Sequence, residues 1–184
     1  MRLHAVWQCQ SLASTEHFSL SDGPDGYVLK GVSMLPLEDV PVEIRYEVDA
    51  NQAWVTRRAS VEISSAGGSR SMSVVVDGRS WSVNGSIVDA LEGCEDIDLG
   101  WTPATNILPM RRLDLDVGDT ATTRAAWLRF PELTWEPSEQ TYTRLDEDHW
   151  RYQSGTADHE IFVTPDGLAC RYGDVFWGSV ERVG

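Results

Sequence analysis

Residues 42–49 read Val-Glu-Ile-Arg-Tyr-Glu-Val-Asp, and this stretch decides the fold class. Every second residue is apolar or aromatic, and every residue between them is charged. Because successive side chains of a β-strand point to opposite faces, this period of two predicts a strand with one buried face and one face in water. The predicted buried face is Val42, Ile44, Tyr46 and Val48, and the predicted exposed face is Glu43, Arg45, Glu47 and Asp49.

Similar segments recur about every ten residues on both sides of this strand, with turn sequences between several of them. The turn sequences are Asp77-Gly78, Asn84-Gly85 and Pro165-Asp166-Gly167. The predicted strands are residues 27–34, 55–63, 72–76, 79–83, 111–117, 125–130, 140–145, 150–153, 160–164 and 168–172. This spacing is typical of sandwiches, barrels and rolls, so the chain is predicted to be all-β with a roll or an open barrel-like antiparallel sheet.

Two segments are also open to a helical interpretation. Residues 86–91 are long enough for a turn or two of helix, and residues 119–130 have an Asp cap with Ala125 and Leu128 at helical spacing. Two threonines and Trp127 make a strand the preferred prediction for the second segment. No linker, repeat or low-complexity run divides the chain, so we expect one domain over residues 1–184.

The charge balance excludes some partners. With 29 acidic against 15 basic groups, the net charge is −14, and such a chain should repel nucleic acids and anionic bilayers. The sequence shows neither a membrane span nor a secretory signal, so we expect no stable membrane insertion and a cytoplasmic location. Cys9, Cys94 and Cys170 are far apart without a CxxC pair, which predicts reduced, unlinked thiols and no metal site.

Residues 93–113 read Gly-Cys-Glu-Asp-Ile-Asp-Leu-Gly-Trp-Thr-Pro-Ala-Thr-Asn-Ile-Leu-Pro-Met-Arg-Arg-Leu and differ from their surroundings. Strand parity places Asp96 and Asp98 on one face. Pro103 and Pro109 predict a stiff loop after these two acids, in which Thr105 and Asn106 can hydrogen-bond to the backbone of their own turn. We expect Arg111 and Arg112 to follow on opposite faces of the next strand, and at least one of them to be mostly buried and paired with Asp96 or Asp98.

The paired acids have three interpretations. They can form a structural ion-pair network with the arginines, which is the preferred one. They lie close enough together to act as the two carboxylates of a retaining glycoside hydrolase. A calcium site is the third, although the glycine-punctuated loop of known calcium motifs is missing; its ligands would be Glu92, Glu95, Asp96 and Asp98.

Other residues carry little catalytic signal. The histidines stand in unrelated segments, and no Gly-x-Ser-x-Gly elbow occurs; the four are His4, His17, His149 and His159. Cys94 has acids beside it, which raise the pKa of a thiol, so a buried, unreactive thiol is expected. The sequence therefore suggests neither a catalytic residue nor a cofactor.

The segment 93–113 carries a family resemblance, mainly through Cys-x-Asp-x-Asp and Thr-Pro-x-Thr-Asn-x-Leu-Pro-x-Arg-Arg-Leu. Further pieces agree in order: Tyr46, Asp49, Trp54-Val-Thr-Arg57, Trp81, Gln140-x-Tyr142, Trp150-Arg-Tyr152 and Asp166-Gly-Leu168. Together they resemble the bacterial family of putative glycolipid-binding proteins, whose fold is described as a spiral β-roll. The resemblance covers essentially the whole chain, except that residues 175–179 depart from the basic ending of the family. It implies the fold and a ligand class, and it implies no catalytic residue or cofactor.

On this basis we predict that the roll binds an amphipathic lipid or glycolipid. Eight tryptophans are available to line a cavity or stack on sugars, and Trp101 lies in the predicted loop, where burial is least required. The small residues expected to leave space are Ala5, Gly31, Ala59 and Ala126. The predicted ligand-binding residues are Trp54, Arg57, Trp81, Asp96, Asp98, Trp101, Asn106, Arg111, Arg112, Tyr142 and Tyr152.

Two other functions remain open. One is a hydrolase that uses Asp96 and Asp98 with Arg111 or Arg112. The other is a protein-interaction module that uses an exposed sheet edge and takes no small ligand. A large apolar pocket would favour lipid binding, a polar cleft with perturbed carboxylates would favour the enzyme, and a filled interior with a flat exposed face would favour the module. Neither the ligand nor the oligomeric state follows from the sequence.

Overall fold

A computed structural model describes residues 2–182, and it confirms the all-β fold. Fifteen strands in this range belong to one sheet, accompanied by short helical segments. The strands are β1 (Arg2–Cys9), β2 (Ser14–Gly23), β3 (Gly26–Leu37), β4 (Val40–Ala50), β5 (Thr56–Ser65), β6 (Gly68–Asp77), β7 (Ser80–Val83), β8 (Ser86–Ile87), β9 (Asp96–Leu99), β10 (Thr120–Leu128), β11 (Trp135–Arg144), β12 (His149–Ser154), β13 (Ala157–Val163), β14 (Ala169–Tyr172) and β15 (Phe176–Arg182). The helical segments are η1 (Asp89–Leu91), η2 (Ala104–Asn106) and α1 (Ile107–Leu113).

The sheet is open, with β8 at one edge and β9 at the other. From β1 to β8 and from β10 to β15 each strand pairs antiparallel with the next in sequence, and β1 joins the two series by pairing with β15. The exception is β9, which pairs with β10 in parallel. The sheet therefore forms an open roll and does not close into a barrel.

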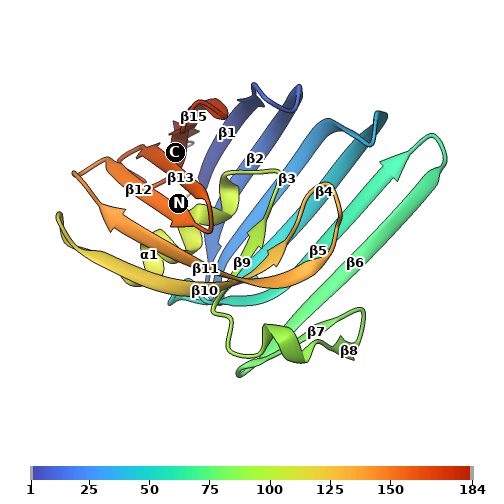
Figure 1. The fold of residues 1–184 in the computed structure, drawn as a ribbon, viewed down its shortest axis with the longest axis horizontal. Coiled ribbons are helices and arrows are strands. Elements are labelled where there is room, and N and C mark those ends of the chain that lie inside the picture. The colour runs from blue at the N-terminus through green and yellow to red at the C-terminus, as the bar shows by residue number, and fades with distance from the viewer. Residues whose placement is uncertain (1, 183–184) are drawn as a thin grey trace.

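The curled sheet encloses β9 and α1. In Figure 1, strands β10–β13 lie in front of the broad layer β1–β6, with β9 and α1 in the space between. Ile97 of β9 and Leu108 of α1 belong to the larger core, which they share with strands β1–β7. Met110 of α1 belongs to a smaller core with Tyr142 and other residues of β11–β14. The helix therefore packs against both cores, and β9 packs one face against the larger core.

The period-two pattern identified the middle strands but missed β1, β2, β8 and β15. Strand β4 has the predicted alternation, with Ile44 and Val48 fully buried. In β2 the buried face carries Ser14 and Glu16 together with Phe18. Polar residues on a buried face remove the contrast on which the pattern depends.

One predicted strand is wrong. Residues 111–117 do not form a strand, because α1 runs through Arg111 and ends at Leu113, where Asp114 adopts a left-handed conformation with φ 46°. Pro109 is compatible with this helix because it lies in the first turn, whose N–H groups have no partner within the helix. In the segment 86–91, which was open to a helical interpretation, Ser86–Ile87 forms β8 and only Asp89–Leu91 is helical, as η1. The preferred strand within residues 119–130 is confirmed as β10.

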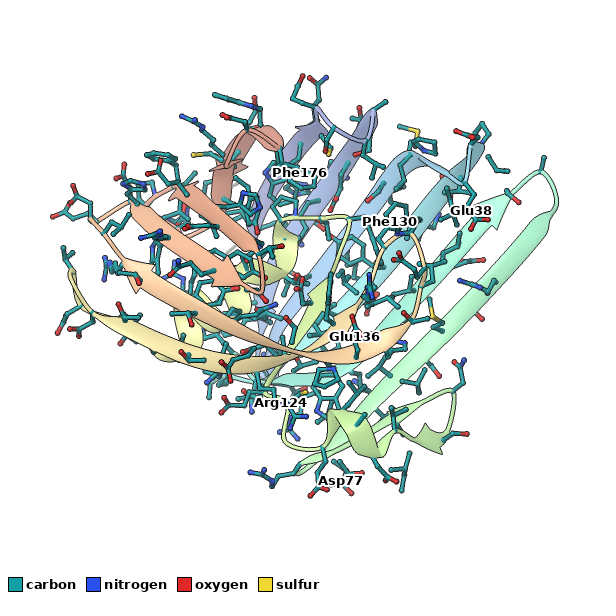
Figure 2. All side chains as sticks on the ribbon, in the orientation of Figure 1. Glu38, Asp77, Arg124, Phe130, Glu136 and Phe176 are labelled. Carbon is teal, nitrogen blue, oxygen red and sulfur yellow. The ribbon has the colours of Figure 1, made fainter. Side chains whose placement is uncertain are left out.

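The interior next to the tryptophans is filled. Trp81 is fully buried and Trp101 is 2% exposed, and Figure 2 shows side chains occupying the space between the two halves of the roll. The place of a side chain at Gly31 is taken by the Tyr46 ring, which would lie 2.2 Å from an added Cβ. The predicted cavity around these tryptophans is therefore wrong, because a large neighbour occupies the space that a small residue leaves.

Two further expectations concern chemistry and membranes. Cys9, Cys94 and Cys170 are free, as predicted. Within residues 2–182 there is no helix of the length and apolarity that crossing a bilayer requires.

Candidate functional site

The two acids of the central motif share one face of β9, as strand parity predicted. Asp96 lies opposite Ala125 of β10 and Asp98 lies opposite Trp127. The other face of β9 carries Ile97, which packs into the larger core. Although the acids are neighbours, the structure gives them different partners.

Asp96 is held by Arg112, which confirms the predicted ion pair. The guanidinium donates from Nε to Oδ1 at 3.1 Å and from Nη2 to Oδ2 at 2.6 Å, and Thr123 donates to Oδ2 at 3.0 Å. The Asp96 side chain is 1% exposed and that of Arg112 is 14% exposed. Burial raises the pKa of Asp96, while the hydrogen bonds from Arg112 oppose that rise. This acid has a structural partner on each side and no open space in front of it.

Asp98 is held by neutral donors instead. Gln140 Nε2 donates to Oδ2 at 2.7 Å and Thr105 Oγ1 donates to Oδ1 at 3.4 Å. The Tyr142 hydroxyl lies within hydrogen-bonding distance of Gln140 Oε1 at 3.2 Å and Asn106 Oδ1 at 2.9 Å. A polar chain therefore runs from Tyr142 through Gln140 to the Asp98 carboxylate.

The Asp98 side chain faces a hollow of about 230 Å³, which we name the acid–aromatic pocket. Its walls come from β9, the loop after it, β10 and the strands β12–β15. They combine one carboxyl group with several aromatic rings: Asp98, Leu99, Gly100, Thr102, Pro103, Asn106, Trp127, Tyr152, Ala157, His159, Tyr172, Val175 and Phe176. Such a set offers both hydrogen-bonding groups and flat apolar faces.

A second hollow of about 470 Å³ adjoins this pocket and shares Trp127, Tyr152 and Ala157 with it. We name it the side groove; it is formed by the facing ends of β11 and β12, around residues 136–139 and 154–157. Trp127 stands between the two hollows. A ligand bound in the pocket can therefore extend into the groove along this ring.

The electrostatics of the pocket are unusual for a surface hollow. Burial raises the pKa of Asp98 to about 6, although hydrogen bonds from Gln140 and Thr105 act in the opposite direction. Burial also raises the pKa of the Tyr152 phenol. At neutral pH the site thus presents a carboxylate that is poorly solvated and gains from any new hydrogen-bond donor.

One wall of the pocket is anchored from the far side of the roll by Glu16 of β2. The Thr102 hydroxyl donates to Glu16 Oε1 at 2.9 Å, and the Tyr46 hydroxyl donates to the same oxygen. Glu16 is 3% exposed, and burial raises its pKa to about 7 against the effect of these hydrogen bonds. Thr102 in turn accepts from the Ala104 N–H at 3.1 Å, so the loop shape depends on this contact.

The predicted site residues do not gather in one place. Asp98, Asn106 and Tyr152 line the acid–aromatic pocket, and Tyr142 is one hydrogen bond away. Of the others, Asp96 pairs with Arg112, and Trp81 and Trp101 are core residues. Arg111 donates a hydrogen bond to the Asp166 carbonyl. Arg57 lines a different hollow, and Trp54 stacks on Tyr27 of that hollow.

Trp101 was predicted to bind a ligand, but the structure buries it in the core. The loop that carries it folds inward, so the indole packs edge-on against Tyr46 and Phe130 with ring centroids 6.2 and 6.1 Å away. It is part of the core and does not face the acid–aromatic pocket. The neighbouring Gly100 and Thr102 line the acid–aromatic pocket while Trp101 points into the core, and sequence composition does not reveal this difference.

Several pocket residues were not identified from the sequence as ligand-binding. Trp127, His159, Tyr172 and Phe176 come from four different strands. Their only sequence signal is aromatic character, which core residues share. Phe176 begins β15, the strand that lies between β1 and β14.

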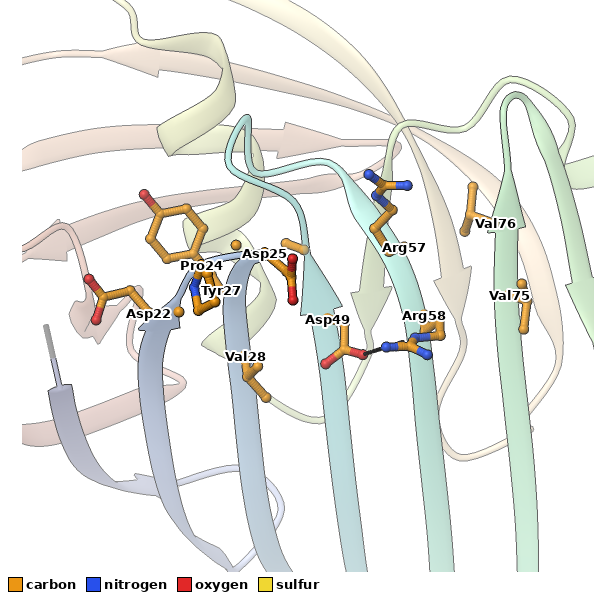
Figure 3. Close-up of a pocket in the computed structure, with 13 residues that line it drawn as sticks. Asp22, Pro24, Asp25, Tyr27, Val28, Asp49, Arg57, Arg58, Val75 and Val76 are labelled. Atoms are coloured by element: carbon orange, nitrogen blue, oxygen red, sulfur yellow. Dashed lines mark hydrogen bonds and ion pairs between the residues drawn. The ribbon is translucent and has the colours of Figure 1, made fainter.

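The largest hollow described in the molecule lies elsewhere and has a volume of about 660 Å³ (Figure 3). We name it the Arg57 pocket. It is lined by the β2–β3 turn and by the adjoining parts of β4, β5 and β6, and it shares no residue with the acid–aromatic pocket. Its lining residues are Asp22, Gly23, Pro24, Asp25, Gly26, Tyr27, Val28, Asp49, Ala50, Arg57, Arg58, Val75 and Val76. Its lining contains one aromatic residue, Tyr27, and its half-buried acid, Asp49, is already paired with Arg58, so it is a poorer candidate for sugar recognition.

Metal ligation was the third interpretation of the acids. Among residues 2–182, His, Cys, Asp and Glu side chains form no group of three or more that could hold a metal ion.

Comparison with known proteins agrees with this architecture. The model of the family described as "Putative glycolipid-binding" matches residues 4–177. The crystal structure of a DUF1089 family protein from Pseudomonas aeruginosa is similar, with a TM-score of 0.80 and 31% sequence identity over 89% of this chain and 91% of that chain. No curated protein matches the chain. Because the family model spans nearly all of the sequence, the chain belongs to the "Putative glycolipid-binding" family.

Proposed function

We propose that this protein binds the carbohydrate head group of an amphipathic glycolipid in the acid–aromatic pocket, without catalysis. The observation that carries the proposal is Asp98, a half-buried residue that lines a hollow with aromatic walls. Carboxylates accept hydrogen bonds from sugar hydroxyls, and aromatic faces pack against the apolar side of a sugar ring. The family name points to the same ligand class.

The size of the site supports a head group more than a whole lipid. The pocket of about 230 Å³ is below the range of roughly 300–1,000 Å³ that encloses drug-sized ligands. The side groove of about 470 Å³ adds room for a second ring or the start of a chain. A long acyl chain does not fit inside the filled core, so it would remain outside the protein.

The same geometry argues against a two-carboxylate hydrolase. Retaining glycosidases need both acids at the scissile bond. Here Asp96 is 1% exposed and bound by Arg112 and Thr123, and only Asp98 lines the pocket. A substrate in this pocket would meet one carboxylate, which suffices for binding.

The test is calorimetric titration with n-octyl β-D-glucoside below its micellar concentration. We expect saturable binding that weakens about tenfold or more, which is about 1.4 kcal/mol, in Trp127→Ala and in Asp98→Asn. Trp177→Ala is the control, because this ring is 47% exposed on β15 and lines neither hollow. Equal affinities for Trp127→Ala and Trp177→Ala, or release of octanol from the glucoside, would contradict the proposal.

A further inference from the structure

The Arg57 pocket presents a charged group that the rest of the fold leaves unused. Within residues 2–182 the Arg57 side chain forms no hydrogen bond, ion pair or ring contact, whereas the next residue, Arg58, is bound by Asp49. In that pair Nε and Nη2 lie 3.1 and 3.0 Å from the same carboxylate oxygen. Figure 3 shows the Arg57 guanidinium at the edge of the hollow, pointing away from the Arg58–Asp49 pair.

An irregularity in the sheet places Arg57 there. Asp49 pairs with Arg58 and the following residue, Ala50, pairs with Thr56, so the register shifts and Arg57 is the extra residue of a β-bulge. A bulge redirects a side chain that regular pleating would send to one face of the sheet. The exposed position of the unpaired Arg57 side chain therefore follows from the bulge in the backbone.

The rim of the pocket is held in place by two side chains of the β4–β5 loop. Gln52 Nε2 donates to the Gly23 carbonyl at 3.0 Å and the Pro24 carbonyl at 3.2 Å, which ties the β2–β3 turn to the β4–β5 loop. Asn51 Oδ1 accepts from the backbone N–H groups of Ala53 at 2.9 Å and Val55 at 3.0 Å. The pocket is thus preformed, which reduces the entropy that a ligand loses on binding.

The backbone of the rim also approaches the sheet closely. Gly26 has φ 139°, and a Cβ at this position would lie 2.0 Å from the Ala50 carbonyl oxygen. Tyr27 stacks on Trp54 with ring centroids 3.6 Å apart, which supports the turn from inside. These contacts leave little freedom for the turn to collapse into the hollow.

We propose that the Arg57 pocket is a second binding site, for a monoanionic ligand that carries one carboxylate on a body with an apolar face. The guanidinium provides a fork that matches a carboxylate. Val28, Val75 and Val76 form an apolar wall, and Val75 is 50% exposed. Asp22 and Asp25 are both exposed and line the same hollow, so the charge around it disfavours ligands with several negative charges. This site is independent of the sugar site proposed above.

Two sources of such a carboxylate are distinguished by experiment. Decanoate carries the charge on an alkyl chain, and D-glucuronate carries it on a sugar ring. Decanol and n-octyl β-D-glucoside are their neutral counterparts. Calorimetric titration of the wild type should show saturable binding of at least one of the two anions, with weaker binding as salt is added.

Arg57→Gln removes the charge at the bulge, and Arg70→Gln removes an exposed arginine of β6 that lines no hollow described here. We expect about a tenfold loss of anion affinity, about 1.4 kcal/mol, in Arg57→Gln and less than about a twofold change in Arg70→Gln. Glucoside binding at the acid–aromatic pocket should be unchanged in both variants, so the two proposals fail separately. The inference is overturned if neither anion binds saturably, if neutral decanol binds as tightly as decanoate, or if both variants lose affinity equally.

Discussion

At the scale of single residues, three buried or half-buried acids with different partners shape the middle of the molecule. Asp96 has a guanidinium, Asp98 has an amide and a hydroxyl, and Glu16 has two hydroxyls. Only the acids without a cationic partner have a pKa raised far from the ordinary value, to about 6 for Asp98 and about 7 for Glu16. The partner, more than burial alone, decides which acid remains charged at neutral pH.

Glu16 should make the stability of the fold depend on pH. Its pKa rises from an ordinary 4.5 to about 7 in the folded state because of burial, so between these values the unfolded chain releases a proton that the folded chain keeps. This contribution to stability is fully present below pH 4.5 and is lost as the pH rises towards and through 7, by about 3 kcal/mol in all. Urea unfolding of the wild type across this range should show the decline.

The control is Glu16→Gln, which cannot ionise but can still accept a hydrogen bond from Thr102. We expect its unfolding free energy to fall less between pH 5 and pH 7 than that of the wild type, and the decline that remains comes from Asp98, whose pKa burial raises to about 6. Parallel pH curves for the two proteins would show that another group is responsible.

At the scale of elements, the parallel pair β9–β10 and the short helix α1 form one unit. Arg112, in the last turn of α1, reaches back to Asp96 at the start of β9, and Thr123 of β10 bonds to both of them. The helix has only seven residues, which is too short to be stable alone in water. Its position therefore depends on this polar contact and on the apolar residues that it places in the two cores.

Removing Arg112 should destabilise the fold strongly. In Arg112→Ala the Asp96 carboxylate remains buried without its cation, and we expect a loss of about 3–5 kcal/mol in the free energy of unfolding. Arg129→Ala removes two exposed ion pairs, with Glu132 and Glu136, and it should cost less than about 1 kcal/mol. Similar losses in the two variants, measured by urea titration at pH 7, would contradict the structural role of the pair.

At the scale of the whole molecule, the first and last strands join the two halves of the roll. β1 pairs with β2 on one side and β15 on the other, and the Trp7 indole N–H donates to the Ala169 carbonyl at 2.8 Å across 162 residues. Gly178 of β15 allows this indole to lie flat against the strand, since an added Cβ would be 2.1 Å from the Trp7 ring. We call the paired strands β1 and β15 the seam. The seam joins the two series of strands into one sheet, although the sheet has two free edges.

Overpacking the seam should weaken the whole fold. We expect Gly178→Ala to cost about 1–3 kcal/mol, because the buried Trp7 ring cannot move away without losing its hydrogen bond. The neighbouring Ser179 is exposed, so Ser179→Ala should change stability by less than about 0.5 kcal/mol. Thermal unfolding of the two variants makes the comparison, and equal melting temperatures would show that the seam tolerates a larger residue.

The sequence by itself determined the all-β class, the middle strands, the turns at Asn84-Gly85 and Asp77-Gly78, and the pairing of an arginine with the motif acids. These features depend on local alternation, on turn chemistry and on the cost of leaving a buried charge unpaired, all of which can be read from neighbouring residues.

Only the tertiary structure decided which side chains surround a hollow. Trp101 and Trp127 are equally aromatic in the sequence, yet the spiral buries one and places the other beside Asp98. Glu16 and Thr102 are 86 residues apart and meet because β2 and the loop after β9 share the interior. Burial and proximity of this kind are set by how the sheet curls, and the curl depends on the packing of all strands together.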